Sequence, residues 1–169
     1  MFESTVLGVD PGLAKTGLAV LGRRGRTATI LWTDTVLTAA RTPEADRLRI
    51  IGAAVREAIA SFRPGSVGVE RVMFGNNKLS ALSVARATGV IMMIAAEAGL
   101  PVEEYVPLEV KSAVTGLGSA DKHQVRDALI RVHGLSGVPR QPDAVDAVAV
   151  ALCHLTRSRL RALARTATP

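Results

Sequence analysis

Residues 4–21 read STVLGVDPGLAKTGLAVL, and this stretch decides the fold. Its first half is an apolar, β-rich run that ends at Asp10, where Pro11-Gly12 forces a turn. A second apolar run at 16–21 predicts a strand beside the first, and a third strand is expected at 27–37. Three consecutive strands with short connections predict an antiparallel meander.

The remaining elements alternate between helices and strands. Apolar residues at three- and four-residue spacing predict an amphipathic helix that starts at Thr42-Pro43, with Thr42 as its N-cap. In order after residue 37, we expect a helix at 42–62, a strand at 66–70, a helix at 78–98, a strand at 102–106, a helix at 119–132 capped by Ser119, and a helix from Pro142 past Leu155. This order predicts an α/β fold with a mixed five-stranded sheet, three antiparallel strands and then two parallel ones, flanked by helices.

Composition indicates one basic globular domain. The 169 residues carry a net charge of +6, which favours nucleic acid as a partner. We expect residues 1–157 to form the domain and residues 158–169 a basic tail, either a solvated helix end or a phosphate contact. The single cysteine, Cys153, is expected to be a packed thiol. No run reaches the roughly 18 apolar residues of a membrane span, and no secretory signal is visible, so we expect a cytoplasmic protein.

Four carboxylates stand in apolar surroundings. Asp10 and Glu70 each end an apolar strand, while Asp143 and Asp146 interrupt an apolar stretch that continues to Leu155. A buried carboxylate without compensation becomes protonated, paired or bound to a cation. Adjacent parallel strands end at one sheet edge, and residues three apart share a helix face, so all four can reach one point. Oxygen ligands in a basic chain predict a Mg²⁺ site acting on phosphates.

Each of these carboxylates also has an ordinary structural explanation. Asp10 can be a turn residue, Glu70 can pair with Lys111 or Arg71, Asp143 can cap its helix, and Asp146 can be an exposed side chain. All four explanations would have to hold at once, which favours the shared metal site.

Such a site suits phosphodiester hydrolysis by a metal-activated water. Two Mg²⁺ ions about 4 Å apart can hold the attacking water and the leaving oxygen. Lys111 and Lys122 are candidates for stabilising the transition state or anchoring the DNA backbone, and they can also be ordinary solvated lysines.

Five motifs together resemble the RuvC family of bacterial Holliday-junction resolvases, over residues 5 to about 155 and in family order. The motifs are Gly8-Val9-Asp10-Pro11-Gly12, Val69-Glu70-Arg71-Val72, Val110-Lys111-Ser112-Ala113-Val114-Thr115-Gly116, Gly118-Ser119-Ala120-Asp121-Lys122 and Asp143-Ala144-Val145-Asp146-Ala147. The resemblance implies an RNase H-like fold and a homodimeric, Mg²⁺-dependent endonuclease that resolves four-way DNA junctions by paired symmetric nicks during recombination and repair.

The resemblance also implies roles for single residues. It places the family's catalytic, metal-binding acids on Asp10, Glu70, Asp143 and Asp146, and its two helpful lysines on Lys111 and Lys122. It implies two Mg²⁺ ions per subunit, leaves Mn²⁺ open as a substitute, and adds the RuvA–RuvB branch-migration complex as a partner.

A junction-contacting loop is expected after Glu70. The family carries an aromatic residue three positions after the catalytic Glu, whereas this chain has Met73 there, followed by Phe74. Either Met73 inserts into the junction or Phe74 replaces it, and Phe74 can instead belong to the core. The expected DNA-binding residues are Met73, Phe74, Asn76, Asn77, Lys78, Lys111 and Lys122.

The helix after this loop carries small residues at every fourth position, Ala81, Ala85 and Gly89. They can pack on the chain's own sheet or form a subunit interface, and the family's dimer interface lies on this helix.

Two other functions fit parts of the pattern. A nuclease of the same fold could act on RNA or RNA–DNA hybrids, although the segment from Lys111 to Lys122 speaks against it. A branched-DNA binding module without catalysis would gain by losing negative charge near phosphates, so the four intact acids argue against that alternative.

Overall fold

The sheet has five strands with the mixed topology that the sequence predicts. The computed structural model describes residues 2–73 and 78–166, apart from the side chains of residues 78–80 and 159–166. The strands are β1 (Ser4–Asp10), β2 (Lys15–Arg24), β3 (Thr27–Leu37), β4 (Ser66–Glu70) and β5 (Val102–Tyr105). Their order across the sheet is β3-β2-β1-β4-β5, with β1, β2 and β3 antiparallel and β1, β4 and β5 parallel.

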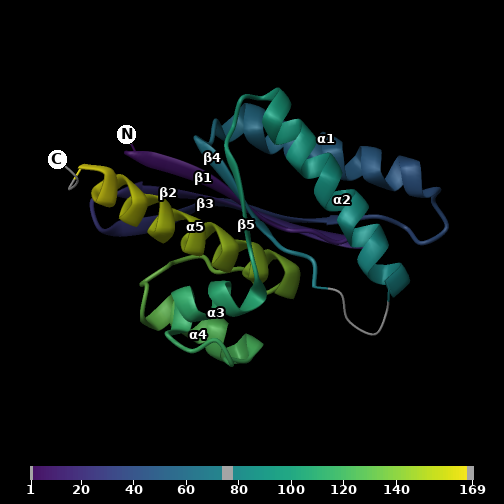
Figure 1. Ribbon diagram of the computed structural model, residues 1–169. Coiled ribbons are helices and arrows are strands. Elements are labelled where there is room, and N and C mark those ends of the chain that lie inside the picture. Colours follow the sequence, from purple (N-terminus) through teal and green to yellow (C-terminus); the bar gives the residue numbers. More distant parts are fainter. Residues whose placement is uncertain (1, 74–77, 167–169) are drawn as a thin grey trace.

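Helices cover both faces of the sheet (Figure 1). They are α1 (Glu44–Phe62), α2 (Lys78–Glu97), α3 (Pro107–Thr115), α4 (Lys122–Arg131) and α5 (Pro142–Thr166). The first two lie on one face, and α5 lies along the other. Helices α3 and α4 pack on the outer side of α5, which therefore lies between the sheet and a further helical layer.

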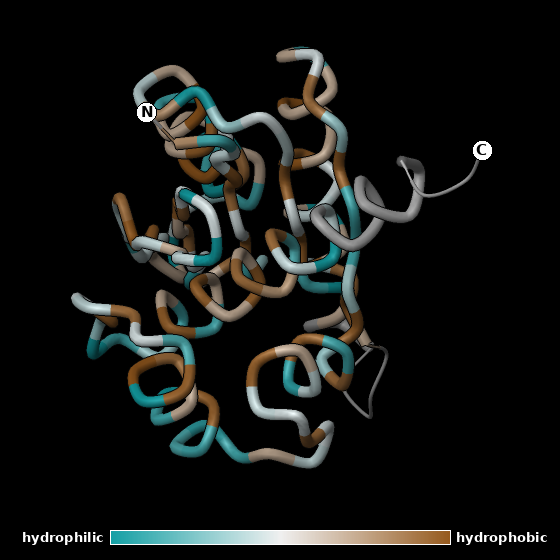
Figure 2. Tube along the Cα trace, turned by 90° about the vertical axis from the view of Figure 1, so that its left-hand side faces the viewer, coloured by the Kyte–Doolittle hydropathy of each residue, from teal (hydrophilic) through white to brown (hydrophobic). Residues whose placement is uncertain are grey.

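Side chains that alternate between the two faces of the sheet form two separate hydrophobic cores. Successive strand side chains point to opposite faces, so Leu7 and Val9 pack toward α1 and α2, whereas Val6 packs toward α5. Around the helices, hydrophobic and hydrophilic residues alternate with the helical repeat (Figure 2). Low aromatic content does not prevent dense packing, because both cores are built mainly from Val, Leu, Ile and Ala.

Helix α5 approaches the sheet closely because two strands carry glycine beneath it. A Cβ on Gly8 would overlap the helix backbone at Ala147 and Ala151, and one on Gly68 would lie 2.8 Å from the Cβ of His154. The close approach explains why so much of α5 is buried and alanine-rich. It also fixes where the acids at the start of α5 stand relative to β1.

Two predicted helix caps are wrong. Helix α1 begins at Glu44 with Pro43 as N-cap, so Thr42 is not the cap; the Thr42 backbone N–H instead donates to the Ala39 carbonyl in a turn. Helix α4 begins at Lys122 rather than near Ser119, because Asp121 accepts from the Gln124 N–H and Gln124 reciprocates in a capping box.

A whole helix, α3, was not expected from the sequence. Pro107 at its first position and the left-handed Gly116 at its end (φ 78°) are the local signals that define it. Among the helices that the structure describes, none is both long and apolar enough to cross a membrane.

Candidate active site

The strands bring Asp10 and Glu70 to one edge of the sheet. As predicted, β1 and β4 are adjacent and parallel, and their register pairs Val9 with Val69. Asp10 and Glu70 are the next residues of the two strands. Their carboxylates therefore start from neighbouring positions at the carboxyl end of the sheet, where α/β proteins place their sites.

Helix α5 adds the other two acids at its amino-terminal end. Asp143 lies in the first turn and Asp146 one turn later, and both are partly buried. Negative charge is favoured there by the free backbone N–H groups of the first turn.

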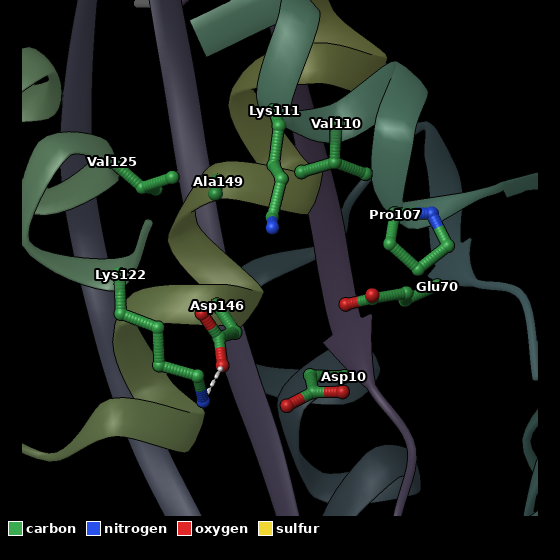
Figure 3. Close-up of a pocket in the computed structure, with 9 residues that line it drawn as sticks. All are labelled: Asp10, Glu70, Pro107, Val110, Lys111, Lys122, Val125, Asp146 and Ala149. Atoms are coloured by element: carbon green, nitrogen blue, oxygen red, sulfur yellow. Dashed lines mark hydrogen bonds and ion pairs between the residues drawn. The ribbon is translucent and has the colours of Figure 1, made fainter. Parts of the chain in front are cut away.

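Three of the four acids line one open pocket of about 310 Å³ (Figure 3). Asp10, Glu70 and Asp146 direct their carboxylates toward the same space, and the ammonium of Lys111 points into it from α3. The remaining lining residues are Pro107, Val110, Lys122, Val125 and Ala149. Asp143 is not part of this lining, but its charge still acts on Asp10.

Burial and mutual repulsion raise the pKa of two of these carboxyls. The pKa of Asp10 is raised to about 8, first by burial and then by the charges of Glu70, Asp146 and Asp143. The pKa of Glu70 is raised to about 7, again first by burial and then by Asp146. The nearby lysines lower both values without cancelling these effects. The pocket therefore holds more negative charge than its own cations compensate.

Lys122 is the direct partner of Asp146. Its Nζ donates to Asp146 Oδ2 at 3.0 Å, and this hydrogen bond is the main cause that raises the pKa of Lys122. Asp146 is thus not a solvent-exposed side chain, since only 24% of it is accessible. Arg71 pairs with Glu104 at 3.9 Å rather than with Glu70.

The donor set suits a hard divalent cation, because carboxylate oxygens are the ligands that Mg²⁺ and Mn²⁺ prefer. Burial first, and then repulsion between neighbouring carboxylates, raises the pKa of Asp10 and Glu70, and a bound cation would favour their ionised forms. Across residues 2–73 and 78–166, no three acidic, histidine or cysteine side chains already stand together as a complete metal site.

The predicted DNA contacts are only partly visible. Met73 follows β4 and is 62% exposed. Phe74, Asn76 and Asn77 lie outside the described residues, and Lys78 begins α2 without a described side chain. Lys111 and Lys122 both reach the pocket.

Two pocket residues were missed together with α3. Pro107 and Val110 form an apolar wall beside Glu70 and Lys111. The proline followed by a helical pattern up to Gly116 could have revealed them.

Known proteins resemble the chain in sequence and in fold. The family model described as "Crossover junction endodeoxyribonuclease RuvC" matches residues 6–154. The protein of that name from Parafrankia sp. is 45% identical over 165 residues, 97% of this chain and 93% of the relative; the one from Leifsonia xyli is 42% identical over 159 residues, 94% and 76% respectively.

Solved structures agree with these relatives. The T. thermophilus RuvC structure in complex with a Holliday junction substrate superposes with a TM-score of 0.87 at 36% identity, covering 94% of this chain and 96% of that one. The yeast mitochondrial resolvase Ydc2 shares the fold at a TM-score of 0.66 and 14% identity, covering 88% of this chain and 76% of that one. On sequence and structure alike, the chain belongs to the RuvC family of crossover junction endodeoxyribonucleases.

Proposed function

We propose that the acidic pocket is the catalytic centre at which this RuvC family member hydrolyses phosphodiester bonds of a four-way DNA junction. The observation that carries the proposal is the convergence of Asp10, Glu70 and Asp146 from three distant segments on one open pocket beside two lysines. Clustered carboxylates repel one another and destabilise the folded state, which indicates that the cluster serves to bind a cation or a substrate.

Family membership implies dependence on a divalent metal, and we assign that metal as Mg²⁺ held by Asp10, Glu70, Asp143 and Asp146. Two ions per subunit fit four carboxylates, with Mn²⁺ as a substitute of the same ligand preference. When bound, the metal supplies Lewis-acid activation of water and neutralises charge on the phosphate. The chain's own contribution is to release the protons of Asp10 and Glu70 and to keep their oxygens turned into the pocket.

The lysines act on the substrate side of the same pocket. Lys111 carries a positive charge toward the place where a scissile phosphate would lie, and this charge would stabilise the additional negative charge of the transition state. Lys122 holds Asp146 in place and stays largely accessible to a phosphate, since 73% of its side chain is exposed.

Substrate selection would come from the loop after β4 and from symmetry. We assign the junction contacts to Met73, Phe74, Asn76, Asn77 and Lys78, of which Met73 is exposed and follows Glu70 by three residues. A cytoplasmic homodimer would present two pockets that match the two-fold symmetry of a junction. We propose the RuvA–RuvB branch-migration complex as its partner.

A junction-cleavage assay tests this function. The purified chain with Mg²⁺ should nick a synthetic four-way junction at symmetric positions in opposite strands, spare linear duplex and an RNA–DNA hybrid, and stop when EDTA is added. Equal cleavage of duplex or hybrid would contradict junction selectivity, and tight junction binding without cleavage in any metal would favour a binding module instead.

A further inference from the structure

Glu109, on α3, is engaged at both of its carboxylate oxygens. Oε2 accepts a hydrogen bond from the Val106 backbone N–H at 3.1 Å, at the N-cap of the helix. Oε1 accepts one from Arg157 Nη1 at 2.7 Å. These contacts, the Val106 N–H first, lower the pKa of Glu109. One side chain therefore fixes the start of α3 and ties it to α5.

Arg157 is correspondingly held by more than one element. Its guanidinium carbon lies 5.4 Å from the centroid of the buried Tyr105 ring, within cation–π range. In the sequence, Arg157 stands at the head of an arginine-rich helix end that resembles a solvated tail. In the structure it is only 35% exposed and packs against α3 and β5.

One face of α5 runs from the catalytic pocket to this ion pair. Asp146, Ala149, Cys153 and Arg157 follow one another at three- and four-residue spacing, so they share a face over about 16 Å. Asp146 and Ala149 line the pocket, and the Cys153 thiol donates to the Glu109 carbonyl at 3.9 Å. Burial raises the pKa of that thiol to about 11, so it acts as a packing group. Helix α3 rests on this face.

Helix α3 carries Lys111 two residues after Glu109, with its ammonium in the pocket (Figure 3). We infer that the Arg157–Glu109 ion pair is a positioning device that sets the place of α3 along α5, and thereby the place of Lys111 over the pocket carboxylates. The inference rests on the proposed role of Lys111 in cleavage. Arg157 and Glu109 are positioning residues: neither lines the pocket.

The contact is strong enough for this task. It is charge-assisted, short and about one-third exposed on both sides, unlike the fully exposed pairs that contribute little. A displacement of about 1 Å at a catalytic group can cost on the order of 100-fold in rate, so a partial shift of α3 has a measurable effect.

A double-mutant cycle tests the inference. Arg157→Met keeps the aliphatic stem and removes the charge; it should slow single-turnover cleavage of pre-bound junction about tenfold, with the junction Kd within about twofold of the parent. Because the ion pair acts through Lys111, the Arg157→Met, Lys111→Ala double variant should cut no more slowly than Lys111→Ala alone. Arg157→Lys should recover part of the rate.

The matched control is Arg56→Met, which removes another interhelical Arg–Glu pair, with Glu97 at 3.5 Å, between α1 and α2. It should cut at the parent rate. If Arg157→Met does not remain folded by circular dichroism at the assay temperature, Glu109→Gln takes its place in the cycle.

Each other outcome is decisive. Losses that multiply in the double variant, or an Arg157→Met variant that cuts normally, would overturn the positioning role while leaving the proposed function intact. A loss confined to junction Kd would make Arg157 a DNA contact instead. A parent chain that fails to cut junctions would overturn the proposed function itself.

Discussion

At the level of single residues, Asp10 combines a proposed catalytic position with a buried charge that is unfavourable for folding. Asp10→Asn keeps the size of the side chain but replaces one carboxylate oxygen with an NH2 donor, so it cannot serve as a full ligand. Cleavage should fall by at least about 1,000-fold, as expected for a group acting in the transition state, while junction affinity should stay equal or increase because a negative charge near phosphates is lost. Glu70→Gln should behave alike.

The control for this prediction is Asp127→Asn, an exposed acid of α4 that pairs with Arg131 at 3.9 Å and lies outside the pocket. Its junction cleavage should equal that of the parent. Normal cutting by both Asp10→Asn and Glu70→Gln would show that the pocket is not the catalytic centre.

The same residue predicts a pH dependence of stability in metal-free protein. The folded-state pKa values of about 8 for Asp10 and about 7 for Glu70 lie above the ordinary values of 3.8 and 4.5. Between these limits the folded chain holds protons that the unfolded chain has released, so these groups make stability fall as pH rises through that window. Asp10→Asn should therefore raise the free energy of unfolding at pH 8 by on the order of 2 kcal/mol, seen as a higher Tm, with a smaller gain at pH 5.

Thermal unfolding in EDTA at both pH values measures this difference. An equal gain at pH 5 and pH 8 would mean that something other than the carboxylate charge of Asp10 limits stability.

At the level of secondary structure, the position of α5 depends on close contact with β2. Gly17 is paired with Asp10 in the sheet, and a Cβ added to it would overlap the backbone of Asp143. Gly17→Ala should push the start of α5 away from the sheet, lower stability by about 1–3 kcal/mol and slow cleavage at least tenfold.

Gly65→Ala is the matched control, because its added Cβ would meet only the Thr5 carbonyl oxygen at 3.7 Å. The Tm and the single-turnover cleavage rate of Gly65→Ala should be close to those of the parent. A Gly17→Ala variant that cuts normally would show that α5 can move without displacing its acids.

Elements with strong periodicity could be predicted from the sequence, whereas their ends could not. The strand ends at Asp10 and Glu70 were correct because a buried apolar run stops sharply at each acid. The cap at Ser119 was wrong because Asp121 stands two residues later and forms the capping box, and the cap at Thr42 was wrong because α1 starts after Pro43 without any side-chain cap. Helix α3 was missed because its nine residues are too short for a clear periodic signal.

The site shows the same division. Residue types and order predicted that Asp10, Glu70 and Asp146 lie together near Lys111 and Lys122, since strand ends and helix faces follow from the pattern. Asp143 was expected at the same point but does not line the pocket. The pairing of Lys122 with Asp146, and of Arg157 with Glu109, could not be predicted, because it depends on how α3 and α4 pack against α5 in three dimensions.

At the level of the whole molecule, the outward face of α2 carries exposed apolar side chains. Leu82 and Met93 are 46% and 51% exposed, and Gly89 has no neighbouring atom within 4 Å of an added Cβ, whereas Ala81 is buried within its own chain. Exposed apolar stripes of this kind usually mark an interface. A second copy of the chain, related by two-fold symmetry, would cover it.

Gly89→Glu should therefore convert a dimer into a monomer in sedimentation, since a buried unpaired carboxylate at a subunit interface costs several kcal/mol. The monomer should still nick junctions but should lose paired cutting, because only one pocket would engage each junction. Val132→Glu, at the exposed C-cap of α4 on the opposite face of the sheet, adds the same charge away from α2 and should remain a dimer with paired cuts. If Gly89→Glu stayed dimeric, α2 would not be the interface; if it became monomeric yet still cut both strands in one binding event, symmetry would not be what couples the two nicks.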